Sequence, residues 1–213
     1  MVSIKRIVLL GMLVGMVSLS SYAQVVTGEQ SDTNLHLQYP LVYTDNIEAQ
    51  DSINKDIAKY VQSAKQAYYN SHIYKVWQNY KVTYEDSQVV SILLTTNYYH
   101  AGAVHEHYFT NGLVYNKVTG QRIPLYNYVK IASVEQLAMG LRTNVLSYYT
   151  ETRKKTYLPQ GWHVIHVSDD YCLRGGGIID LIYQPYQLGP FSYGNTFIEF
   201  SPSAIEYFNR MNN

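Results

Sequence analysis

Histidines gather in one short segment of the sequence, where His100 is followed by His105, Glu106 and His107. Alternate side chains of a strand share a face, so a strand here places His105 and His107 together and turns Glu106 away. Imidazole nitrogens bind zinc, which makes His100, His105 and His107 candidate metal ligands of a hydrolase. Their spacing matches no familiar metal motif, and turn histidines also hydrogen-bond the backbone. We keep this metal-dependent hydrolase as the alternative and otherwise expect no metal and no cofactor.

Other nucleophiles and phosphate-binding loops lack the sequence context that they require. Cys172, the single cysteine, leaves the chain without an intramolecular disulfide, and no signature of a cysteine hydrolase surrounds it. The glycine run at 175–177 leads into a predicted strand, whereas phosphate-binding glycine loops lead into a helix N-terminus. No serine lies in a Gly-x-Ser-x-Gly elbow. We therefore predict that the protein is not an enzyme.

Tyrosine is the compositional outlier, with 23 residues against 5 phenylalanines and 2 tryptophans. A tyrosine joins an apolar ring to a hydroxyl, which suits both a half-buried strand and a contact surface. Tyr183, Tyr186 and Tyr193 flank a loop braced by prolines and glycines, where rings offer contact area at low entropic cost. We predict that these three tyrosines, together with His105, contact a ligand. The alternative is that the rings seal a seam between two lobes.

The N-terminal residues have the three parts of a secretory signal peptide. Lys5 and Arg6 precede an apolar run at 7–19, and small residues up to Ala23 form the expected cleavage site. We predict a signal peptide over 1–23 and a mature protein that is periplasmic or secreted, with no membrane span. Lysine plus arginine and aspartate plus glutamate number 16 each, so no basic excess attracts nucleic acid.

The rest of the chain alternates strand patterns with two amphipathic helices. Apolar residues recur at spacings of three and four from about residue 46, and Ser133 with Gln136 has the form of a capping box. We predict helices near 46–68 and 133–150, and strands at 35–39, 81–84, 89–98, 105–116, 122–125, 162–167, 177–183 and 196–200. Tight turns favour an α+β class with two small lobes, each an antiparallel sheet packed with a helix. The predicted boundaries are a flexible arm at 24–34, an N-terminal lobe at 35–118 and a C-terminal lobe at 119–213.

Three stretches together resemble a known family. Residues 98–105 followed by 115–125 are similar to its Gly-Gly-Ala-His turn and to its strand ending in Asp-x-x-Thr-Gly-Lys. Residues 178–194 are similar to its strand, Pro-Tyr-Glu and glycine-bearing loop, and the third match is Tyr39-Pro40 with the helix after it. The family is the extracytoplasmic domain of the RsiV anti-sigma factors and the PdaC peptidoglycan deacetylases, known as paired domains of unknown function 4163 and 3298.

The chain departs from the family pattern at three positions. Ala101 replaces the first glycine of the turn, Asn116 replaces the aspartate, and Val104 replaces the histidine unless one inserted residue restores His105 to that role. In RsiV the domain is a receptor for lysozyme, and in PdaC it accompanies a separate catalytic domain. The resemblance implies a binding domain of the cell envelope, whose partner is an envelope or host protein such as lysozyme, or peptidoglycan glycan. We expect it to stand alone, without a sigma-binding segment or a deacetylase domain.

Overall fold

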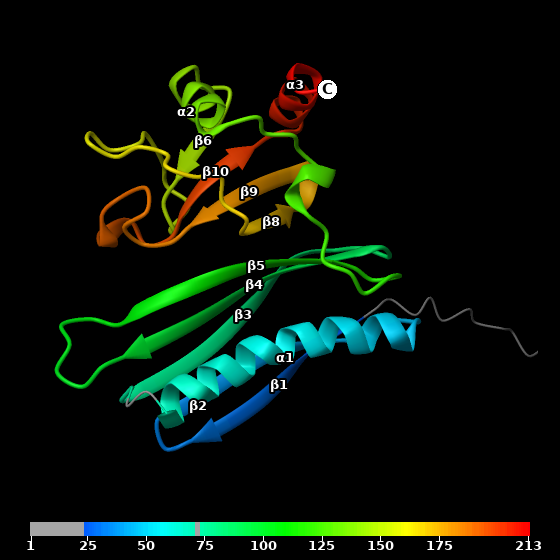
Figure 1. The fold of residues 1–213 in the computed structure, drawn as a ribbon, viewed down its shortest axis with the longest axis vertical. Coiled ribbons are helices and arrows are strands. Elements are labelled where there is room, and N and C mark those ends of the chain that lie inside the picture. The colour runs from blue at the N-terminus through cyan, green and yellow to red at the C-terminus, as the bar shows by residue number, and fades with distance from the viewer. Residues whose placement is uncertain (1–23, 71–72) are drawn as a thin grey trace, which may run out of the picture.

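The computed structural model of the protein describes residues 24–70 and 73–213. The predicted signal peptide, 1–23, lies outside the described residues. Two five-stranded sheets and three α-helices make up the described part, which confirms the predicted α+β class (Figure 1). Among the described residues, no helix has the length and apolar character needed to cross a membrane.

The N-terminal sheet contains its strands in chain order, β1-β2-β3-β4-β5. They are β1 (Val25–Asp32), β2 (Leu35–Val42), β3 (Lys75–Glu85), β4 (Val89–Tyr99) and β5 (His107–Asn116). Neighbours are antiparallel except β2 and β3, which run parallel because the helix α1 (Ile47–Asn70) crosses between them. The prediction of a purely antiparallel sheet was wrong at this pair. The flexible arm predicted at 24–34 was also wrong, since β1 pairs with β2 along its whole length.

The C-terminal sheet is antiparallel and has the order β7-β6-β10-β9-β8. Its strands are β6 (Ser147–Tyr149), β7 (Lys155–Thr156), β8 (Tyr171–Arg174), β9 (Ile178–Tyr183) and β10 (Thr196–Phe200). Its helices are α2 (Val134–Arg142) and α3 (Pro202–Met211), with the short 3₁₀ helices η1 (Leu125–Asn127), η2 (Gly175–Gly177) and η3 (Phe191–Tyr193). α2 and α3 each begin after a serine, Ser133 and Ser201, whose hydroxyl accepts a hydrogen bond from a backbone N–H of the first turn.

Several predicted boundaries in this half differ from the structure. The helix predicted at 133–150 ends at Arg142, because residues 147–149 leave it to pair with β10. The segment 162–167 forms no strand, and 122–125 contributes only an isolated bridge between Tyr115 and Arg122. β8 and α3 are absent from the predicted elements. The glycine run leads into β9, the strand predicted after it, and forms the tip of the β8-β9 hairpin.

The two sheets face each other between the helices (Figure 1). α1 covers the outer face of the N-terminal sheet, where Ile53 and Ile57 join a cluster with buried residues of β4 and β5. α2 and α3 cover the outer face of the C-terminal sheet, where Leu137 and Phe208 are fully buried. The sheets approach so closely that a Cβ on Gly112 of β5 would collide with the backbone of Tyr171 in β8. A glycine is therefore required at this contact.

Side chains from the C-terminal half close the outer edge of β5. The Gln184 amide accepts a hydrogen bond from the Thr110 N–H at 2.9 Å and donates one to the Thr110 carbonyl at 2.8 Å. The Asp170 carboxylate accepts from the Gly112 N–H at 2.9 Å, and the Arg122 guanidinium donates to the Gly112 carbonyl at 2.8 Å. An open edge would leave these backbone groups unpaired. The contacts therefore complete the N-terminal sheet and hold the C-terminal half against it.

Candidate functional site

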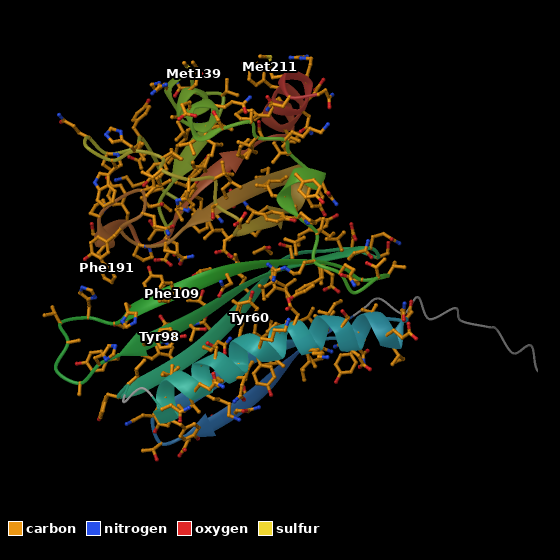
Figure 2. All side chains as sticks on the ribbon, in the orientation of Figure 1. Tyr60, Tyr98, Phe109, Met139, Phe191 and Met211 are labelled. Atoms are coloured by element: carbon orange, nitrogen blue, oxygen red, sulfur yellow. The ribbon has the colours of Figure 1, made fainter. Side chains whose placement is uncertain are left out.

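Aromatic rings from both halves of the chain meet around Phe191, the first residue of η3. The His105 ring stacks on the Phe191 ring with 4.1 Å between centroids, and the Tyr186 ring lies 5.6 Å away. Tyr108 of β5 meets the same ring edge-on at 6.4 Å. Figure 2 shows Phe191 at the end of the C-terminal half that faces β5. We name these four residues the Phe191 platform; they bring two of the predicted contacts, His105 and Tyr186, into one cluster.

The loop that carries Tyr186 is held by its own hydrogen bonds. The Gln187 side chain accepts from the Gln184 N–H at 2.8 Å, and the Gln187 N–H donates to the Gln184 carbonyl at 3.0 Å. Tyr186 has a φ of 70°, in the left-handed region that is uncommon for a residue other than glycine. Its side chain is 57% exposed. A strained backbone that displays a ring to solvent is typical of a functional surface.

A cleft of about 490 Å³ lies beside the platform. We name it the Glu151 cleft; its lining residues are Glu106, Tyr108, Thr150, Glu151, Thr152, Lys154, Phe191, Ser192, Tyr193 and Gly194. The Glu151 carboxylate accepts a hydrogen bond from the Tyr108 hydroxyl at 2.8 Å and from the Asn195 amide at 3.3 Å. A Cβ on Gly194 would collide with this carboxylate, so a glycine at 194 leaves the room that Glu151 occupies.

The carboxylates of the cleft have no ion-pair partner within the described part of the chain. Glu106 and Glu151 take part in none of the salt bridges between described residues. Burial, the hydrogen bond to Glu151 and the nearby charge of Glu106 raise the pKa of Tyr108 well above its usual value. The Tyr108 hydroxyl is therefore protonated at neutral pH and donates to Glu151.

The other two predicted tyrosines have different surroundings. Tyr183 is fully buried in the core of the C-terminal half, and its hydroxyl donates to the His166 carbonyl at 3.0 Å. Its ring offers no surface to a ligand, so Tyr183 leaves the set of candidate contacts. Tyr193 is half-buried against the same core and lines the Glu151 cleft. It stays a predicted contact, together with His105 and Tyr186.

The three histidines of the metal alternative divide between two ring clusters. β5 begins at His107, whose ring stacks on His100 and on Tyr98, each with 5.4 Å between centroids. His105 precedes the strand and turns to Phe191 instead. No group of three metal-ligating side chains occurs among residues 24–70 and 73–213. The predicted sharing of one strand face by His105 and His107 was wrong, because the strand starts too late to include His105.

Cys172 of β8 is fully buried in a cluster with Ile182 and Phe197. Burial, with a contribution from the charge of Asp180, raises the pKa of its thiol to about 12. A thiol in this state packs as a small apolar group.

The fold and the site define an α+β domain of two facing sheets with an aromatic cleft where its halves meet. A scan against protein-family models found no match, and a search of curated proteins found none either. Among solved structures, the chain is similar to a DUF3298 family protein from Pseudomonas aeruginosa PAO1, with a TM-score of 0.59 and 12% sequence identity, covering 86% of this chain and 92% of that chain. It is also similar to a member of the same family from Bacteroides fragilis NCTC 9343, with a TM-score of 0.55 and 16% identity, covering 87% of this chain and 91% of that chain. The chain thus has the fold of this family of unknown function, and identities this low show the fold alone.

Sequence reasoning missed three residues of the site: Phe191, Tyr108 and Glu151. Phe191 follows a proline in the loop already singled out for its tyrosines, so its position was a usable signal. Glu151 carries no local signal. Its hydrogen-bond partners, Tyr108 and Asn195, lie 43 and 44 residues away along the chain.

Proposed function

We propose that the protein is a non-catalytic binding domain of the cell envelope, periplasmic or secreted, that holds a protein partner against the Phe191 platform. One observation carries the proposal: His105 and Tyr186 come from different halves of the chain and both contact Phe191. Rings that are already in position bury area in a partner with little loss of side-chain entropy. Aromatic residues of this kind contribute most of the binding free energy in many interfaces.

Lysozyme is the first partner to test. The resemblance to the paired 4163 and 3298 domains of RsiV supports this choice, and the DUF3298-like fold is consistent with it. Peptidoglycan glycan is the second candidate, because Glu106 and Glu151 stand beside aromatic rings in the cleft. Carboxylates accept hydrogen bonds from sugar hydroxyls, and rings pack against apolar sugar faces.

The test compares two exposed tyrosines in the C-terminal half. Tyr186→Ala removes a platform ring, whereas Tyr157→Ala removes a ring that is 78% exposed and outside the platform. We expect Tyr186→Ala to weaken lysozyme binding about tenfold or more at an unchanged melting temperature, and Tyr157→Ala to leave binding unchanged. Surface plasmon resonance measures lysozyme binding, and co-sedimentation measures binding to peptidoglycan.

Two outcomes would overturn the proposal. One is the absence of binding to both lysozyme and peptidoglycan at micromolar protein. The other is a lower melting temperature of Tyr186→Ala with unchanged binding, which would show that the ring seals the junction between the sheets and contacts no partner.

A further inference from the structure

Glu106 and Glu151 place negative charge in the cleft beside the platform, and neither forms an ion pair with a described residue. We propose that the Glu151 cleft receives a basic side chain, lysine or arginine, of the protein partner. The inference rests on the proposed function and names the chemistry by which the same surface selects its partner.

The Glu151 carboxylate is fixed in position by neutral groups. The Tyr108 hydroxyl and the Asn195 amide donate to its two oxygens, and the Glu151 N–H donates to the Tyr193 carbonyl at 3.0 Å. A carboxylate has about four lone-pair sites, so two donors leave sites for an ammonium or a guanidinium. Because the carboxylate is already ordered, little entropy is lost when a cation binds it.

Aromatic rings supply the second half of a cation site. Phe191, Tyr108 and Tyr193 line the same cleft as Glu151, and the faces of such rings attract cations. The protein already uses this combination internally, because the Arg153 guanidinium lies 4.0 Å from the centre of the Phe197 ring and pairs with a carboxylate at 2.7 Å. The cleft presents ring and carboxylate in the same combination to a group from outside.

Charge favours a cation over a neutral glycan in this cleft. The described lining residues include two carboxylates and one ammonium group, that of Lys154. Negative charge therefore exceeds positive charge in the lining, and this excess is complementary to a cationic ligand group. A neutral sugar would leave the carboxylate charge uncompensated.

The experiment uses a charged probe and its uncharged analogue. The protein is titrated with Nα-acetyl-arginine amide and with Nα-acetyl-citrulline amide, which keeps the shape and lacks the charge, and backbone amide shifts are followed by NMR. We expect the arginine probe to shift the amides of Glu151 and Gly194, and the citrulline probe to shift them far less. The response should weaken at ~0.5 M salt, because an exposed carboxylate is screened.

Variants assign the effect to the cleft. Glu151→Gln should weaken binding of the arginine probe about tenfold, the loss expected for one charged contact. Glu206→Gln, an exposed residue of α3, is the matched control and should bind as the wild type does. Glu106→Gln repeats the test at the second carboxylate if the first variant does not fold. Equal responses to both probes, or unchanged binding by folded Glu151→Gln and Glu106→Gln, would overturn the inference.

The same variants separate this inference from the proposed function. If lysozyme binds wild type, Glu151→Gln and Glu106→Gln equally but fails to bind Tyr186→Ala, the cation site is disproved and the binding platform stands. If Tyr186→Ala binds as wild type does, the platform itself is disproved. If Glu151→Gln loses peptidoglycan binding alone and the arginine probe has no effect, the cleft takes a glycan and the cation site is again disproved.

Discussion

Gly194 has φ 62° and ψ −147°, a backbone conformation almost confined to glycine. A Cβ at this position would also collide with the Glu151 carboxylate. Gly194→Ala therefore adds steric repulsion to backbone strain, and we expect the free energy of unfolding to fall by about 3 kcal/mol. Urea unfolding measures this loss. Because Glu151 must move in this variant, the arginine probe should bind it less tightly as well.

Gly161 provides the matched control for Gly194. It has a φ of 84°, and a Cβ there would meet nothing within 4 Å. Gly161→Ala carries backbone strain without a collision, so we expect a loss of only about 1 kcal/mol. Equal losses in the two variants would show that the contact with Glu151 has no influence on stability.

At the scale of elements, Gln184 ties the edge of β5 to the C-terminal half. Gln184→Ala removes both hydrogen bonds to Thr110 and leaves its backbone groups unpaired, so we expect the free energy of unfolding to fall by about 2 kcal/mol. The control is Gln30→Ala on β1, where an exposed side chain makes a single hydrogen bond of 3.3 Å. Thermal unfolding of the two variants checks the difference. A loss as small as that of Gln30→Ala would mean that water replaces the Gln184 amide without cost.

His107, the first residue of β5, makes stability depend on pH. Partial desolvation of its exposed ring lowers the pKa of His107, and the nearby His100 and His105 lower it further. The folded state then binds fewer protons than the unfolded state near the unfolded pKa of ~6.5, so stability falls as the pH decreases through that value. We expect urea midpoints to be lower at pH ~5 than at pH ~7.5, and this difference to shrink in His107→Gln.

His36 on β2 is an exposed histidine outside the ring clusters and serves as the control for the pH effect. His36→Gln should keep the full pH dependence of the wild type. An unchanged pH dependence in His107→Gln would assign the acid sensitivity to other groups.

The predictability of each element follows from where its stabilising contacts lie. α1 and α2 were predictable because their signals lie within short stretches of sequence. α1 has an apolar stripe, and α2 has a serine cap, Ser133, which accepts a hydrogen bond from the Gln136 N–H. β1 is polar and mostly exposed, so its sequence lacks the alternation of apolar and polar residues that indicates a strand, although it pairs with β2. α3 also carried a local signal, Ser201 before Pro202, but this signal is a cap and not an apolar periodicity. Residues 162–167 alternate like a strand but have no neighbouring strand to pair with.

For the whole molecule, the contacts between the sheets predict a single cooperative unfolding transition. The Leu173 N–H donates to the Ser91 hydroxyl at 2.9 Å. Gly112 has no side chain, so the backbone of Tyr171 packs directly against it. Each half contains one tryptophan, Trp77 in β3 and Trp162 before β8. In Trp77→Phe and Trp162→Phe, we expect the remaining tryptophan fluorescence to change at the same urea concentration as the far-UV circular dichroism. Separate transitions would show that the halves unfold independently.

The site was partly predictable for the same reason as the fold. Tyr186 stood out because prolines and glycines brace its loop, and His105 because of its neighbouring histidines. What unites them is Phe191, which meets His105 only after the two halves have docked. The Glu151 cleft likewise exists only in the folded molecule, since its hydrogen bonds join separate parts of the chain. Sequence patterns describe single elements, whereas this site is a property of their junction.

Two of the residues whose side chains close the outer edge of β5 are synthesised long after the strand itself. β5 ends at Asn116, and Arg122 follows soon after it, but Asp170 and Gln184 also close the edge and are made much later. At a synthesis rate of roughly 5–20 residues per second, the strand waits several seconds for these partners. Throughout that interval a nascent chain exposes the kind of strand edge on which a second copy can pair. A folded N-terminal half therefore offers its own copies a pairing edge until Gln184 has been made.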